Sequence, residues 1–318
     1  MFIAQAFTIK HDWWRYFIGI IIIITAWQGI GVIPLLVVGF FNTGSLGAFI
    51  EAAQQNFTGI GMDSNLLLSL MIFSFIVGLL AIWFVSIHIH EQKIRSLTTS
   101  RATVDWSRIF FSFFLVFFTN IILFVIMYFQ NPDIYQFQFQ VFPFLILLLI
   151  AIFLLPLQTS FEEYLFRGYL MQGIGVLAKN KWLPLIITSV IFGLLHSFNP
   201  EVAKLGPIML VFYIGTGFLL GIMTLMDEGM ELALGFHAAN NMIAATLVTT
   251  DWSALQTDAL FLDTSEPVAG WELMLPLVIQ YPIYIFILAK KYGWKDWKNR
   301  LLGYVTPPIY QVDEKTTI

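Results

Sequence analysis

The sequence predicts an all-α fold, a polytopic helical membrane protein with about eight transmembrane helices. Three observations support this fold class. The chain of 318 residues is 58% hydrophobic and only 11% charged, a balance that ordinary soluble domains do not show. Several apolar runs are as long as the roughly 20 residues that a helix needs to cross a bilayer. Lysine and arginine concentrate in alternate loops, as the positive-inside rule predicts for such a protein.

Eight apolar segments follow one another along the chain, with tryptophans near many of their ends, as expected at a membrane interface. In order, these segments are about 17–41, 66–89, 109–129, 141–178, 182–198, 207–226, 232–248 and 273–289. The first segment is longer than a signal-peptide core and has no small-residue cleavage site after it, so we expect a retained span. Because no repeat or soluble-domain stretch interrupts the series, residues 1–318 are expected to form a single transmembrane domain.

The fourth segment, from Val141 to Ala178, is unusually long. As one straight helix it would measure about 57 Å, well beyond a hydrocarbon core of about 30 Å. It must therefore tilt strongly, break near Pro156 or continue outside the membrane. The sixth segment carries Gly215, Gly217 and Gly221, a spacing that allows another helix to approach closely.

The charge distribution predicts an orientation and excludes several classes of function. With the N- and C-termini in the cytoplasm and eight alternating spans, every lysine and arginine except Lys204 falls on the cytoplasmic side or at its membrane edge. The chain contains no cysteine, which excludes disulfides, a thiol nucleophile and a cysteine metal site. It also lacks the basic surface run that nucleic-acid binding requires, so no nucleic-acid partner is expected.

Polar side chains inside the apolar segments are the candidates for function, because ionisable groups at membrane depth are costly. They are Glu162, Glu163 and Arg167 in the fourth segment, His196 late in the fifth, and His237, Asn240 and Asn241 in the seventh.

The spacing of these residues predicts how they pair. Glu163 and Arg167 are four residues apart and share a helix face, so they can form an ion pair. Glu162 is rotated by about 100° from Glu163 and stays outside that pair. Glu162 and His196 are equally far from the polar turn at Lys179, so an antiparallel helical hairpin would bring them level. We expect the site in the cytoplasmic half of the bilayer, open to water on that side.

These side-chain types are suited to one kind of chemistry. A carboxylate beside a histidine, such as Glu162 beside His196, can hold and deprotonate a water molecule. A second histidine and an amide one turn apart, His237 and Asn241, can donate hydrogen bonds to a developing oxyanion. Together they are the parts of an amide-hydrolysis site that uses neither a serine nor a cysteine nucleophile.

Three short motifs carry a resemblance to a known family. Residues 162–167 read EEYLFR, residues 192–196 read FGLLH and residues 237–241 read HAANN. They match the patterns EExxxR, FxxxH and HxxxN, and in this order on successive hydrophobic segments they resemble the CPBP intramembrane proteases. That family, also called ABI, contains the CAAX prenyl endopeptidases and bacteriocin-processing proteins. The resemblance implies an intramembrane catalytic core at about residues 141–250.

The resemblance also implies roles for the motif residues. Glu162 and His196 would activate the hydrolytic water, while Glu163 and Arg167 would orient the site.

In the second half of the implied site, His237 and Asn241 would stabilise the oxyanion. The family is often described as metalloproteases, but the HExxH pattern is absent here, and no cofactor is certain. A divalent metal such as Zn²⁺, if present, would be held by Glu162, His196 and His237.

The expected function is that of a glutamate/histidine-dependent intramembrane endopeptidase. It would cleave a peptide or a membrane-anchored protein near the cytoplasmic face, in a multi-pass protein of a prokaryotic plasma membrane. Its partners would be membrane lipids, the substrate and subunits of a membrane complex. Two alternatives remain open. One is a non-catalytic membrane partner with an immunity or complex-assembly role. The other is a proton-coupled transporter, which the lack of an internal repeat disfavours.

Overall fold

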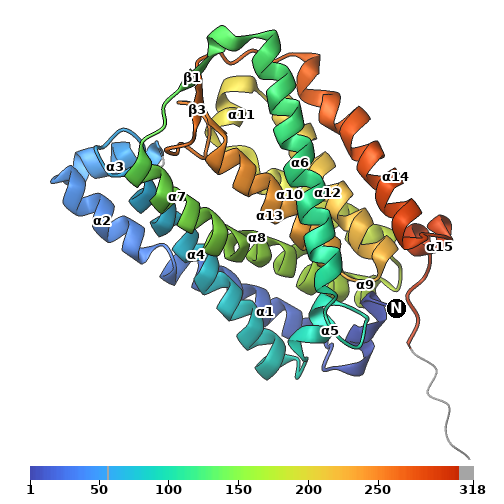
Figure 1. The fold of residues 1–318 in the computed structure, drawn as a ribbon. Coiled ribbons are helices and arrows are strands. Elements are labelled where there is room, and N and C mark those ends of the chain that lie inside the picture. The colour runs from blue at the N-terminus through green and yellow to red at the C-terminus, as the bar shows by residue number, and fades with distance from the viewer. Residues whose placement is uncertain (56, 308–318) are drawn as a thin grey trace, which may run out of the picture.

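The computed structural model describes residues 1–55 and 57–307, and the protein is predominantly helical over that range (Figure 1). The helices of the first third are η1 (Ile3–Thr8), α1 (Trp13–Ile24), η2 (Thr25–Ile30), α2 (Ile33–Thr43), α3 (Leu46–Gln54), α4 (Ser64–Phe84), η3 (Val85–Ile89), α5 (Ile94–Thr98) and α6 (Trp106–Gln130). Those of the middle third are η4 (Pro132–Ile134), α7 (Val141–Phe153), α8 (Leu155–Glu163), η5 (Tyr164–Leu170), α9 (Met171–Ala178), α10 (Trp182–Leu195), η6 (His196–Phe198) and α11 (Pro200–Leu205). Those of the last third are α12 (Ile208–Asp227), α13 (Glu231–Thr246), η7 (Trp271–Met274), η8 (Pro276–Gln280), α14 (Tyr281–Tyr292) and α15 (Trp297–Leu302).

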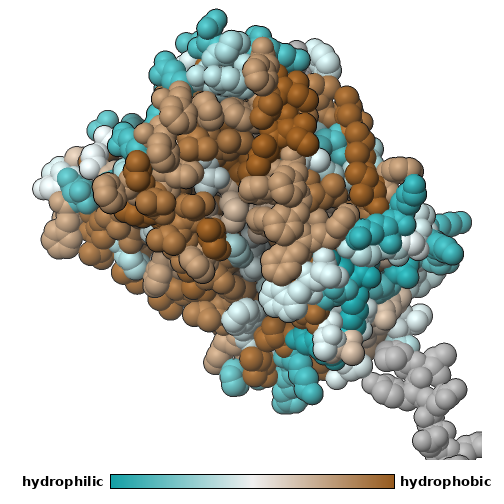
Figure 2. Space-filling model, in the orientation of Figure 1, coloured by the Kyte–Doolittle hydropathy of each residue, from teal (hydrophilic) through white to brown (hydrophobic). Residues whose placement is uncertain are grey.

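Five of the eight expected spans are helices long and apolar enough to cross a membrane, within the described residues. They are Trp13–Thr43, Ser64–Ile89, Trp106–Gln130, Val141–Ala178 and Ile208–Asp227. The helix over Trp182–Phe198 is apolar but shorter, α13 has 16 residues, and the eighth segment is divided into η7, η8 and α14. Figure 2 shows a broad apolar band between polar ends. The protein is thus a helical integral membrane protein, with five spans supported by length rather than eight.

The long fourth segment is broken, as one of the three alternatives predicted. Helix α7 ends at Phe153 and α8 begins at Leu155, with Pro156 in its first turn. Proline has no backbone N–H and clashes with the preceding turn, so the regular hydrogen bonding of α7 cannot continue through it. Beyond the break, α8 leads into the π-helical turn η5, a geometry often found at functional sites.

The two ends of the molecule differ in charge. At one end, which we call the basic end, the N-terminus, α5, α9 and α15 lie together (Figure 1). Here Arg101 forms ion pairs with Asp227 and Glu231, and Arg108 also binds Asp227. These bonds tie the loop before α6 and the first turn of α6 to the end of α12 and the start of α13. The predicted cytoplasmic C-terminus itself, residues 308–318, lies outside the described residues.

The opposite end, which we call the acidic end, carries α3 and a small sheet that the helical patterns did not predict. Strand β3 (Phe261–Asp263) lies between β1 (Tyr135–Phe137) and β2 (Val248–Thr249), antiparallel to the first and parallel to the second. The register pairs Tyr135 with Asp263 and Val248 with Phe261. The sheet fixes the loop after α13 over the end of the helical bundle.

Glycines bring α10 and α12 together as the sequence predicts. A Cβ atom on Gly217 would lie 2.7 Å from the backbone oxygen of Ser189, and one on Gly221 would lie 2.5 Å from a methyl group of Leu185. Only glycine allows this approach, which sets α10 and its C-terminal histidine against α12. The resulting core is continuous from the basic end to the site.

Candidate active site

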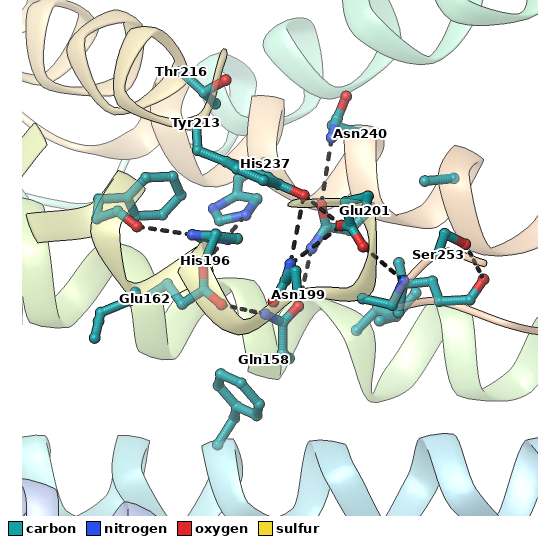
Figure 3. Close-up of a pocket in the computed structure, with 18 of the residues that line it drawn as sticks. Gln158, Glu162, His196, Asn199, Glu201, Tyr213, Thr216, His237, Asn240 and Ser253 are labelled. Atoms are coloured by element: carbon teal, nitrogen blue, oxygen red, sulfur yellow. Dashed lines mark hydrogen bonds and ion pairs between the residues drawn. The ribbon is translucent and has the colours of Figure 1, made fainter. Parts of the chain in front are cut away.

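A cavity of about 490 Å³ lies within the helical bundle, between α4, α8, the end of α10, α12 and α13. Glu162, His196, His237 and Asn241, the four expected catalytic residues, all line it. Figure 3 shows Glu162, His196 and His237 grouped in one part of the cavity, while Asn199, Glu201 and Ser253 lie further along it. Glu163 and Arg167, the residues expected to orient the site, lie behind this wall and are both fully buried.

Glu163 connects Arg167 to His237. Arg167 Nη1 donates to Glu163 Oε1 at 3.1 Å, so the ion pair expected from the four-residue spacing is present. The same oxygen accepts a hydrogen bond from His237 Nδ1 at 2.8 Å. Arg167 also donates from Nη2 to the backbone oxygen of Gly217 at 3.1 Å. A buried charge is stable only with such partners, and this set fixes the orientation of the His237 ring.

Glu162 stands apart from that ion pair, as its different helix face predicts. Its Oε1 accepts a hydrogen bond from Gln158 Nε2 at 2.5 Å. Its Oε2 is buried and has no hydrogen-bond partner among the described residues, and it lies 3.6 Å from His237 Nε2. A buried carboxylate oxygen without a partner is costly, so this atom has the capacity to bind a water molecule or a substrate group.

His196 is held by its backbone and by an aromatic ring. It lies in η6, directly after α10, and its Nδ1 donates to the backbone oxygen of Phe192 at 2.7 Å. Because that nitrogen carries the donated proton, Nε2 of the neutral ring keeps a free lone pair. The ring stacks on Tyr213 with centroids 4.2 Å apart and planes 20° apart. Both contacts restrict the direction in which Nε2 points.

Asn241 belongs to the same hydrogen-bond network. Its Nδ2 donates to Gln158 Oε1 at 3.1 Å, and its Oδ1 accepts from Asn240 Nδ2 at 3.4 Å. Gln158 therefore joins Asn241 to Glu162. Since an amide nitrogen has two hydrogens, the second hydrogen of Asn241 remains able to reach another acceptor.

The sequence analysis missed two groups of side chains. Gln158 lies four residues before Glu162 and thus on the same helix face, a signal that was present in the sequence. The second group lies beyond His196: the Tyr213 hydroxyl donates to Glu201 Oε1, and Glu201 Oε2 accepts from the backbone N–H of Ala254 at 2.9 Å. No local pattern indicated this group, because its members come from α11, α12 and the loop after β2.

The metal that the family description suggests does not fit this arrangement. Within residues 1–55 and 57–307, no three histidine or acidic side chains come together as a group able to hold a metal ion. Glu162, His196 and His237 line one cavity but do not form such a ligand set. The chemistry proposed for this site therefore uses no metal.

The lining of the cavity runs from buried rings toward one end of the molecule. Its inner wall consists of buried aromatic rings, including Phe166, Phe192 and Phe236. From there it continues toward the acidic end, where Asn240 and Leu195 are exposed. Thr250 and Ser253 at the acidic end also line the cavity, and the expected opening to water on the cytoplasmic side stays a prediction.

Comparison with known proteins supports the resemblance. Residues 137–243, which include all three motifs, match the family model described as type II CAAX prenyl endopeptidase Rce1-like, and the predicted resemblance to the CPBP/CAAX proteases is confirmed. The uncharacterised protein YyaK of Bacillus subtilis (strain 168) is 34% identical over 186 residues, which are 58% of this chain and 62% of that protein. The match thus covers less than two thirds of the relative's length. No solved structure matches the chain.

Proposed function

We propose that the protein is an intramembrane endopeptidase in which Glu162 is the general base for hydrolysis of a peptide bond. The observation that carries this proposal is the buried, unpartnered Oε2 of Glu162 beside His237, in a cavity that His196 also lines. The family match makes a CAAX-type protease the nearest class of activity. The substrate would be a peptide or a membrane-anchored protein.

In the proposed reaction, a water molecule is held between Glu162 Oε2 and His196 Nε2. Glu162 accepts a proton from the water as its oxygen attacks the carbonyl carbon of the scissile bond. His237 donates a hydrogen bond from Nε2 to the oxyanion, and Glu163 at Nδ1 stabilises the imidazolium form that this donation requires. The free N–H of Asn241 is a second donor.

Collapse of the tetrahedral intermediate completes the reaction. The C–N bond breaks, and the proton held by Glu162 passes to the leaving nitrogen. The products are a carboxylic acid and an amine, and Glu162 returns to its ionised form. No covalent bond to the protein forms at any stage.

The test is cleavage of a peptide library by the purified protein in nanodiscs, with new termini identified by mass spectrometry. The wild type is compared with Glu162→Gln, which keeps the shape of the side chain but cannot accept the proton. Cleavage by the wild type alone supports the proposal. Equal cleavage by both proteins would remove Glu162 from the base role, and no cleavage by either would favour the non-catalytic partner.

A further inference from the structure

We propose that the site receives an apolar peptide segment through the acidic end of the molecule, from the non-cytoplasmic side of the membrane. This inference rests on the proposed function for the identity of the reaction. It goes beyond that function in assigning the route of access and the chemical class of the segment that is bound.

The basic end of the site is closed. Glu163 and Arg167 fill the space directly behind Glu162 and His237, and neither side chain is exposed. Further toward the basic end, the core residues that pack between α12 and α13 are also fully buried; they include Leu220, Met223, Leu232 and Ala233. The ion pairs of Asp227 with Arg101 and Arg108 cover this core. A polypeptide cannot reach Glu162 by this route without separating α12 from α13.

The acidic end offers continuous space. The main cavity extends past Asn199 to the loop after β2, where Thr250 and Ser253 line it. A second cavity of about 130 Å³ shares Asn199 and Ser253 with the first and reaches Phe198, whose side chain is 92% exposed. The two cavities thus adjoin between the surface of the acidic end and the catalytic residues, and we take them together as the path.

The walls of this path indicate what it binds. Opposite the catalytic residues, α4 contributes an apolar face of Leu68, Met71, Ile72 and Phe75. The carboxylate at the outer part of the path, Glu201, is occupied by Tyr213 and a backbone N–H. An apolar segment therefore suits the path, because a charged segment would lose its hydration without gaining partners.

The charge bias assigns the side of the membrane. Arg101, Arg108 and Arg300 all lie in the ion pairs of the basic end, and Lys204 is the one lysine or arginine that the predicted topology places at the other side. Positively charged loops remain in the cytoplasm during membrane insertion. The acidic end, with the cavity path, then faces the non-cytoplasmic side.

Cysteine labelling tests the inference with no background signal, because the natural chain contains no cysteine that would react. Ser253→Cys and Thr250→Cys place a thiol in the path. Thr103→Cys, in an exposed loop at the basic end, is the matched control. Intact bacterial cells that express each full-length variant are treated with a membrane-impermeant maleimide, before and after permeabilisation. Labelling after denaturation measures the amount of each variant.

We expect both path variants to be labelled in intact cells and Thr103→Cys only after permeabilisation. The reverse pattern would overturn the assignment of the side. A further arm adds a synthetic peptide of alternating leucine and alanine with a lysine at each end, which we expect to slow labelling of Ser253→Cys severalfold. If labelling proceeds at an unchanged rate with this peptide, the apolar segment is the wrong occupant.

These outcomes are independent of the failure of the proposed function. Labelling and its protection require no hydrolysis, so they report access even if no peptide is cleaved. If the protein is labelled and protected as expected but cleaves nothing, the result supports the binding path and contradicts the endopeptidase function. If the protein cleaves peptides but is labelled only after permeabilisation, the result supports the endopeptidase function and contradicts the path.

Discussion

His237 donates its Nδ1 proton to Glu163 at 2.8 Å, while its other ring nitrogen faces Glu162 at 3.6 Å. The two adjacent glutamates therefore contact opposite sides of one histidine. Each glutamate keeps one oxygen without a partner among the described residues. Glu163 binds His237 and Arg167 through its other oxygen, whereas Glu162 lies outside the ion pair with Arg167 and lines the cavity. In the proposed mechanism, Glu163 therefore orients the site and Glu162, which faces the cavity, accepts the proton.

Loss of the Glu163 charge should destabilise the protein. Glu163→Gln leaves the fully buried Arg167 without its counter-ion, and breaking a buried pair costs about 3–5 kcal/mol. Thermal unfolding in detergent measures this effect. The double variant Glu163→Gln/Arg167→Gln removes both charges and should recover much of the lost stability. A single variant as stable as the wild type would show that the pair does not hold the charge of Arg167 in place.

Gln158 should matter for catalysis although it lies outside the three motifs. Gln158→Met keeps the volume of the side chain but removes the hydrogen bonds to Glu162 and Asn241. With about 1 kcal/mol for each bond, kcat/KM should fall roughly 30-fold. The matched control is Gln172→Met, which removes hydrogen bonds to Gln92 and Ser96 at the basic end. The control should lower stability but leave kcat of the folded protein unchanged; an equal loss of kcat in both variants would contradict the prediction.

The stacked ring of Tyr213 should hold the ring of His196 in position. Tyr213→Phe keeps the ring that stacks at 4.2 Å and should retain most activity, whereas Tyr213→Leu removes the stack. An aromatic pair contributes about 0.5–1.5 kcal/mol beyond burial, so the leucine variant should lose up to about tenfold in kcat/KM. The pH profile of kcat/KM distinguishes positioning from a general structural effect, because only a displaced His196 shifts the profile. The same profile in both variants would argue against this role.

The ion pairs at the basic end should stabilise the fold without affecting the chemistry. Asp227 is buried and binds Arg101, Arg108 and the indole N–H of Trp294. Asp227→Ala leaves two guanidinium groups without this partner and should cost a few kcal/mol of unfolding free energy. Glu91→Gln breaks the exposed pair with Lys10 and should change stability by less than about 1 kcal/mol. Denaturant unfolding of both variants tests this difference. Equal losses of unfolding free energy would contradict the prediction.

The sequence predicted the parts of the fold that depend on local pattern. Apolar runs located the helices, Pro156 marked the break in the fourth segment and Gly217 marked a close helix contact. Eight spans are not confirmed, because the last segment is divided at η8 and α13 is short, features that hydropathy does not reveal. The strands at the acidic end are two or three residues long, too short for a periodic signal.

For the site, residue spacing predicted the contact within one helix but not the contacts between helices. The Glu163–Arg167 pair followed from four-residue spacing. The bond between Glu163 and His237 joins residues 74 apart, and no periodic pattern encodes it. The direction of the cavity also depends on side chains from distant segments, such as Tyr213 and Ser253. The spacing within one hairpin therefore does not determine which way the cavity extends.

The most direct measurement is kcat/KM for one cleaved peptide with the wild type, Glu162→Gln, His196→Ala and His237→Ala, each with and without a chelator. A general base contributes about 10²–10⁴-fold and an oxyanion donor about 10²–10³-fold, so every variant should lose at least about 100-fold. The chelator should change nothing in the wild type, since no three histidine or acidic side chains are grouped to hold a metal ion among the described residues. Full activity in any of the three variants, or loss of wild-type activity with the chelator, would contradict this account.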